Sequence, residues 1–73
     1  MAMQHLIVEY DRSRKVYIDG DWGGWTNEQL ELEAGRHDVD LGEPPNVEPG
    51  RYTIDLYETS VNDPMVISFV RKS

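Results

Sequence analysis

Two tryptophans are the residues of this sequence best suited to chemistry. Trp22 and Trp25 flank a pair of glycines within residues 20–26, which we expect to form a glycine-rich loop. Large flat rings that carry one N–H donor serve recognition well, and Tyr17, on an outward face nearby, would extend such a surface. The pattern predicts an aromatic binding surface for a protein or a sugar ring. The alternative is that the indoles fold back and close one end of a thin core.

Carboxylates form the second group of candidate binding residues. Asp19 and Asp21 flank Gly20, and Asp38 and Asp40 alternate along one outward strand face. Carboxylates and loop carbonyls are the ligands that Ca²⁺ prefers, but the spacing lacks the D-x-D-x-D-G pattern of a calcium loop. We therefore predict a solvated acidic face without a metal or other cofactor, on which Asp19 and Asp21 contribute to binding a partner.

Catalysis is poorly supported by the residues present. His5 and His37 fall on different predicted strands, no serine stands in a nucleophile-elbow context, and cysteine is absent. His37 shares a face with Val39 and Leu41, which indicates a core or rim histidine bonded to the backbone. Because a chain of this size also offers little volume for a closed site, we predict no catalytic residues and no enzyme activity.

Charge and hydropathy narrow the classes of partner. The 73 residues include 7 Lys and Arg against 14 Asp and Glu, which gives a net charge of −7. Such a field repels phosphate backbones and anionic membrane surfaces, so we expect no nucleic acid and no membrane partner. The sequence also lacks the run of about 20 apolar residues that a membrane-spanning helix needs. Without a signal-peptide pattern we expect a cytoplasmic protein, although an excised or processed domain would leave the compartment open.

Alternating apolar and polar residues predict six strands, over residues 5–10, 15–19, 30–33, 36–41, 51–58 and 65–71. Three prolines mark residues 42–50 as a surface loop, with Pro49 and Gly50 at the centre of a type II turn. The residues expected to face inward are Leu6, Val8, Tyr10, Val16, Ile18, His37, Val39, Leu41, Tyr52, Ile54 and Leu56. These elements predict one all-β domain, a small antiparallel β-sandwich of about six strands.

One stretch resembles a known family. The pattern D-G-x-x-x-G-x-T begins at Asp19, and after a short gap L-x-L-x-x-G-x-H-x-V begins at Leu30; together they resemble the PEGA domain, an immunoglobulin-like β-sandwich module. The resemblance covers residues 16–41 well and the rest loosely. It departs from the family at Asn27, where proline is common, and in the elaborated loop 42–50. It implies a β-sandwich used as an accessory domain of envelope, surface or signalling proteins.

From these observations we expect a non-catalytic protein-interaction module that displays the Gly/Trp-rich loop and an acidic sheet face. The expected binding residues are Trp22, Trp25, Asp19, Asp21 and Tyr17. One alternative is a carbohydrate-binding module that uses the two tryptophans to bind a glycan. The other is a structural domain that forms a homo-oligomer edge to edge, since outer strands present unpaired backbone groups.

Overall fold

The structure, a computed structural model, describes residues 3–42 and 46–71, and within them the chain contains strands and loops but no helix. The strands are β1 (Gln4–Glu9), β2 (Lys15–Ile18), β3 (Asp21–Trp25), β4 (Gln29–Leu32), β5 (Gly35–Asp40), β6 (Val47–Glu48), β7 (Tyr52–Leu56), β8 (Met65–Ser68) and β9 (Val70–Arg71).

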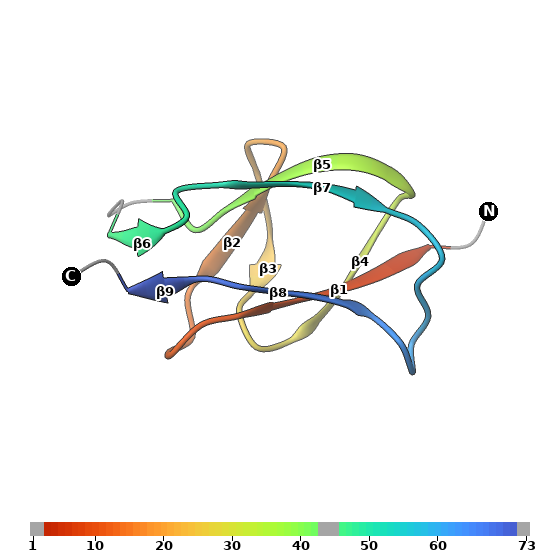
Figure 1. The fold of residues 1–73 in the computed structure, drawn as a ribbon, viewed down its shortest axis with the longest axis horizontal. Coiled ribbons are helices and arrows are strands. Elements are labelled where there is room, and N and C mark those ends of the chain that lie inside the picture. Colours follow the sequence, from red (N-terminus) through yellow and green to blue (C-terminus); the bar gives the residue numbers. More distant parts are fainter. Residues whose placement is uncertain (1–2, 43–45, 72–73) are drawn as a thin grey trace.

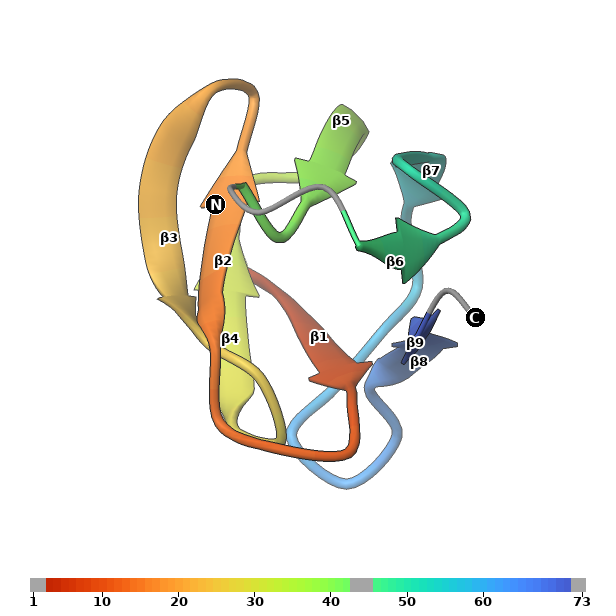
Figure 2. The same cartoon turned by 90° about the vertical axis from the view of Figure 1, so that its left-hand side faces the viewer.

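These strands build two main layers with the core between them. One sheet has the order β4-β1-β8 and the other β3-β2-β5-β7, while β6 and β9 pair as a short two-stranded sheet. Figure 1 shows β5 and β7 above β1 and β8, and Figure 2 shows the layers from the end near β6 and β9. The predicted fold class, a small all-β sandwich, is confirmed.

The core is built from alternate side chains of the strands, as the sequence pattern predicts. Leu6, Val8, Val16, Val39 and Leu56 have a solvent-exposed fraction of 0%. The other buried apolar side chains are Tyr10, Ile18, Leu30, Leu41, Val47, Ile54, Ile67 and Phe69. Burial of one large aliphatic side chain contributes about 1.5–3 kcal/mol, so this shared core is the main source of stability.

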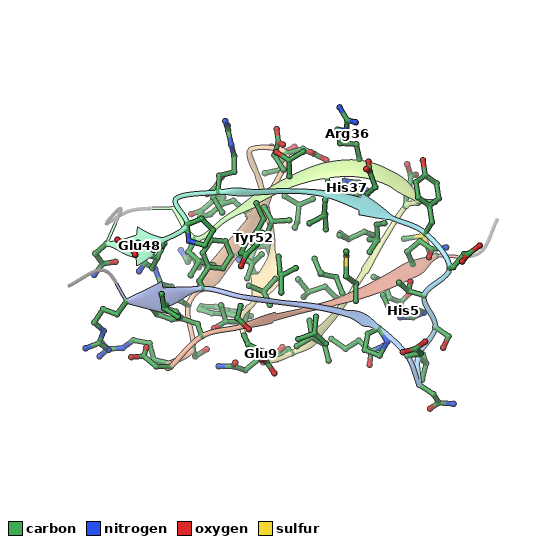
Figure 3. The ribbon with its side chains drawn as sticks, viewed as in Figure 1. His5, Glu9, Arg36, His37, Glu48 and Tyr52 are labelled. Carbon is green, nitrogen blue, oxygen red and sulfur yellow. The ribbon has the colours of Figure 1, made fainter. Side chains whose placement is uncertain are left out.

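Two predicted inward residues lie half-buried at the rim of this core. Tyr52 lies between the layers (Figure 3). Its hydroxyl donates to the Ser68 carbonyl at 2.7 Å, and its ring meets Phe69 edge to face with centroids 5.0 Å apart. His37 lies along β5 with a side chain that is 13% exposed. Both side chains keep a polar atom within reach of a backbone carbonyl, which explains their place at the rim.

The residues predicted as a loop at 20–26 are mostly strand, and that prediction was wrong. Ile18 and Asp21 pair directly across the two residues Asp19 and Gly20, whose φ angles are 52° and 88°. Positive φ at both central positions is what a type I′ hairpin requires, and Asp-Gly is a preferred sequence for it. The hairpin therefore carries β2 straight into β3, the outermost strand of its sheet.

Three further differences concern the C-terminal half. β8 runs parallel to β1, pairing Leu6 with Met65, because residues 57–64 cross to the other sheet before β8 begins. The predicted strand 65–71 divides into β8 and β9 at buried Phe69. The predicted loop 42–50 contains β6, which pairs with β9, and Gly50 lies outside the positive-φ region that a type II turn requires.

A polar contact holds the chain where it passes from β3 to β4. Thr26 is 1% exposed, and its hydroxyl donates to the Arg12 carbonyl at 2.7 Å and accepts the Arg14 N–H at 2.9 Å. The Asn27 side chain accepts from the Tyr10 N–H at 3.1 Å and donates to the Tyr10 carbonyl at 3.0 Å. We call these contacts of Thr26 and Asn27 the Thr-Asn clamp. It fixes the β1–β2 turn against the crossing point between the sheets.

The conformation of Asn27 does not allow a proline at this position. Its φ is 64°, and its N–H donates to the Val8 carbonyl at 2.7 Å. Proline fixes φ near about −65° and has no N–H, so proline at this position would break both the backbone conformation and the hydrogen bond.

We predict that Thr26→Val destabilises the protein by about 1–3 kcal/mol, because valine fills the same space but leaves the Arg12 carbonyl and the Arg14 N–H without their partner. Urea unfolding followed by circular dichroism measures the change. The matched control is Thr53→Val, whose exposed hydroxyl donates to Asp38 at 2.8 Å, and we expect it to change the free energy of unfolding by less than about 0.5 kcal/mol. Equal losses in the two variants would contradict the role of the clamp.

Candidate functional site

A β-bulge in β3 places both tryptophans on the same side of the sheet. Val16 pairs with Gly24, but Tyr17 pairs with Trp22, so Gly23 is an extra residue in the edge strand. Residues three apart in a regular strand face opposite sides, and one extra residue reverses that alternation. Trp22 and Trp25 are accordingly 59% and 38% exposed, and their rings lie side by side.

The two glycines of the bulge explain why the indoles do not enter the core. The backbone of Gly23 lies against the Ile18 side chain, and that of Gly24 against Leu30, so a Cβ at either position would overlap them. Gly24 also has a φ of 139°, a conformation that other residues rarely adopt. Backbone atoms therefore cover the core at this edge, and the bulky rings face the solvent.

The tryptophans form an edge-to-face pair that continues onto β2. Their centroids are 6.4 Å apart and their planes lie at 82°. Tyr17 lies across the sheet from Trp22, on the same face, and its ring packs over Gly42, where a Cβ would come within 2.5 Å of Cε2. We call Trp22, Trp25 and Tyr17 the aromatic face.

An open groove of about 560 Å³ adjoins this aromatic face; it is lined by Lys15, Tyr17, Gly20, Asp40 and Gly42. Lys15 pairs with Trp25 in the β2–β3 ladder, and Asp40 pairs with Tyr17 in the β2–β5 ladder. One cation and one anion thus border the aromatic rings. Sequence reasoning identified the aromatic residues but missed Lys15 and Gly42. Sheet register places Lys15 beside Trp25, and Gly42 joins the groove through its approach to the Tyr17 ring.

The carboxylates of the outer face are engaged within the protein. Asp38 Oδ1 accepts the Thr53 hydroxyl at 2.8 Å, and Asp40 Oδ1 accepts the Gly42 N–H at 2.9 Å. Over residues 3–42 and 46–71, no group of three or more His, Cys, Asp or Glu side chains is arranged to hold a metal ion. The same residues contain no helix long and apolar enough to cross a bilayer. Asp38 thus links β5 to β7, and Asp40 orders the chain at the end of β5.

Asp19 and Asp21, both predicted as binding residues, occupy different environments. Asp19 Oδ2 lies 2.7 Å from His37 Nδ1, and Oδ1 accepts the Asp38 N–H at 2.9 Å. Asp21 is exposed at the start of β3. The structure therefore joins Asp19 to His37 and β5, whereas Asp21 stays on the strand that carries the tryptophans.

Oxygen atoms lie on both sides of the His37 ring, an arrangement that favours its protonated form. Its Nε2 lies 2.7 Å from the Glu33 carbonyl, which can only accept, and its Nδ1 faces the Asp19 carboxylate. Burial of the ring alone would lower the pKa of His37, but these two bonds outweigh it and raise the pKa above 6.5. The N–H of Asp38, and then His37, lower the pKa of Asp19 below 3.8.

No protein-family model, no curated protein and no solved structure matches this chain. The chemistry of the aromatic face and its surroundings is therefore the basis for assigning a function.

We predict that the protein loses stability as the pH rises above 6.5 through the raised pKa of His37. When folding raises the pKa of a group, protonation of that group stabilises the folded state. This contribution is complete at pH values below the unfolded-state pKa and is lost as the pH rises through the folded-state pKa. For Asp19 the contribution is present above 3.8 and disappears as the pH falls through its lowered pKa. Melting temperatures recorded between pH 3 and 9 measure both the loss of stability at high pH and the loss at low pH.

The control for this pH dependence compares substitutions of two neighbouring carboxylates, one in contact with His37 and one not. Asp19→Asn should lower the pKa of His37, read from its ring resonances by NMR, whereas Asp21→Asn at the other end of the same turn should change it little. An unchanged His37 pKa in Asp19→Asn would refute the ion pair.

We also predict that the native tryptophan emission is red-shifted and readily quenched by acrylamide, since both rings are in contact with water. In Trp25→Phe the remaining Trp22, at 59% exposure, should be quenched faster than Trp25, at 38%, in Trp22→Phe. Blue-shifted, protected emission would mean that the rings are buried in solution, and the aromatic face would not exist there.

Proposed function

We propose that this protein is a non-catalytic protein-interaction module that binds its partner through the aromatic face. The observation that supports this most strongly is a pair of neighbouring, exposed tryptophans on a bulged edge strand. Interface hot spots are enriched in tryptophan and tyrosine surrounded by a polar rim. Trp22, Trp25 and Tyr17 supply such anchors, and Lys15 and Asp40 supply the rim.

The ring geometry favours a protein over a glycan as the partner. Planes at 82° offer one ring edge and one ring face, not a shared flat platform on which successive sugar rings could stack. Side chains of a partner protein can enter such an angular surface because they approach from several directions. The glycan alternative retains a stacking site on a single indole ring.

The position of β3 supports a particular way of binding. β3 is the outermost strand of its sheet, and its neighbour on the inner side is β2. An edge strand offers unpaired N–H and C=O groups to which an extended segment can add. We propose that a partner strand pairs with β3 while its side chains contact the tryptophans; a second copy of this chain, pairing edge to edge, is the homo-oligomeric alternative.

Charge suggests the composition of the partner. A net charge of −7 favours association with basic surfaces and speeds it by electrostatic steering. The exposed carboxylates near the aromatic face, such as Asp21, would meet a basic segment. The preferred partner is therefore an extended segment that combines apolar and basic side chains.

We also propose that the chain is a PEGA-like module. The all-β sandwich and the position of the D-G-x-x-x-G-x-T residues on the β2–β3 hairpin are compatible with that resemblance. The family's use as an accessory interaction domain agrees with the function proposed above.

The test is selection of a displayed random-peptide library on immobilised wild-type protein, followed by measurement of the affinity of each selected peptide for the wild type and for the variant carrying Trp22→Ala and Trp25→Ala. We expect enriched basic, apolar peptides that bind the double variant at least about tenfold more weakly, since loss of one hot-spot aromatic costs roughly 2 kcal/mol or more. The matched control is Tyr57→Ala, which removes another aromatic side chain, 60% exposed, outside the aromatic face.

The alternatives give different results in parallel measurements. Binding to a glycan array that depends on Trp22 would favour the carbohydrate-binding module. Concentration-dependent sedimentation of the protein alone would favour edge-to-edge assembly. Peptides that bind the double variant as tightly as the wild type would refute the proposed function.

A further inference from the structure

A second pocket has a charge opposite to that of the protein as a whole. This pocket, about 230 Å³ in volume, is lined by Tyr10, Arg12, Arg14, Asn46 and Arg71. Of the seven Lys and Arg in the chain, three line this one pocket, although they are up to 59 positions apart (71 − 12). The fold therefore concentrates positive charge at one end of an acidic protein. We call these five residues the arginine pocket.

Two of the arginines are oriented by one carboxylate beside the pocket. Arg71 donates to Asp11 Oδ2 at 2.7 Å, and Arg12 Nε lies 3.7 Å from Asp11 Oδ1. All three side chains are at least half exposed, so both guanidinium groups keep donors that solvent reaches. A carboxylate shared by two guanidinium groups positions them without occupying all of their N–H groups.

Arg14 is fixed by a different set of contacts. Its guanidinium donates to Asn46 Oδ1 at 2.6 Å and to the Gly42 carbonyl at 3.3 Å, and it lies over the Tyr10 ring at 5.8 Å. Because Asn46 Oδ1 accepts from Arg14, the amide group of Asn46 retains Nδ2 as a donor. The backbone of Arg14 is held in turn by the Thr-Asn clamp. These contacts orient Arg14 and Asn46 before a ligand binds, which reduces the entropy lost on binding.

We propose that the arginine pocket binds a phosphate group. Guanidinium groups present planar forks of N–H donors that match phosphate oxygens, and several arginines around one site are suited to a dianion. The volume admits a small oxyanion and is below the range of about 300–1,000 Å³ typical of larger ligands. The amide of Asn46 adds a neutral donor. The phosphate is either free in solution or carried on a side chain of a protein partner.

The net charge of the protein does not prevent this binding. Exposed charges more than about 8 Å from the ligand are largely screened at physiological ionic strength. The local charge is therefore set by the three guanidinium groups and the one carboxylate beside them, Asp11, and it is positive. A long nucleic-acid backbone would also meet the acidic sheet faces, whereas a single phosphate group meets the pocket alone. The proposal is independent of the aromatic face, and the variant with Trp22→Ala and Trp25→Ala should bind phosphate as the wild type does.

Titration of the protein with inorganic phosphate at constant ionic strength, balanced with NaCl, tests the proposal. We expect saturable ¹H–¹⁵N shifts confined to the β1–β2 turn, Asn46 and Arg71. Arg71→Gln and Arg12→Gln should each weaken binding by about tenfold, as expected for loss of one charged hydrogen-bonding partner. The matched control is Arg36→Gln, because Arg36 is also exposed and ion-paired, with Asp55 at 3.4 Å, and points away from the sandwich (Figure 3).

A second arm distinguishes the source of the phosphate. A short phosphoserine peptide is compared with its unphosphorylated form and with inorganic phosphate. If the phosphorylated peptide binds more tightly than inorganic phosphate and the unphosphorylated peptide does not bind, the pocket binds phosphate carried on a protein partner. If the phosphopeptide and inorganic phosphate bind with equal affinity, the pocket binds the free ion. Shifts that do not saturate with either ligand, or an equal loss of affinity in Arg36→Gln and Arg71→Gln, would overturn the proposal.

Discussion

The Thr-Asn clamp is the contact on which the rest of this small sandwich depends. Every sandwich must carry its chain from one sheet to the other, and here the crossing follows directly after an edge strand. Thr26 and Asn27 satisfy the backbone groups of the β1–β2 turn at that point, including groups at Tyr10, Arg12 and Arg14. Thr26 is buried, although Asn27 is exposed, and a slip at Thr26 would leave the Arg12 carbonyl and the Arg14 N–H without their partner.

The clamp also fixes the end of β3, and for this reason the bulge determines which way the tryptophans face. With Thr26 held, the strand from Asp21 must fit one extra residue into its pairing with β2. Glycine is the residue type that fits there, since the backbone lies directly on Ile18 and Leu30. The exposure of the tryptophans thus follows from the backbone geometry of the bulge.

Much of the fold was predictable because strand periodicity is local. The alternation of Leu6 and Val8, or of Ile54 and Leu56, predicts both the strand and its buried face. The strand after Asp19 was also within reach, since Asp-Gly is a strong type I′ hairpin signal that the neighbouring glycines obscured.

Long-range pairing was not predictable in the same way. The parallel pairing of β1 with β8 and the β6–β9 pair depend on where a connection crosses, which no local pattern encodes. The approach of Asp19 to His37 depends on register between β2 and β5, and the arginine pocket joins residues from opposite ends of the chain. Of the five predicted binding residues, Trp22, Trp25, Asp19 and Asp21 are exposed and Tyr17 is half-buried. Asp19 is at the same time engaged with His37.

The aromatic face and the arginine pocket are connected by one short series of contacts. Arg14 donates to the Gly42 carbonyl, and the Tyr17 ring packs on Gly42. Coupling between two sites requires an element with two alternative arrangements, whereas these contacts define a single arrangement. Their effect is to hold the two surfaces at a fixed spacing, so a partner that carries both a phosphate group and an apolar strand would gain from the two together by effective concentration.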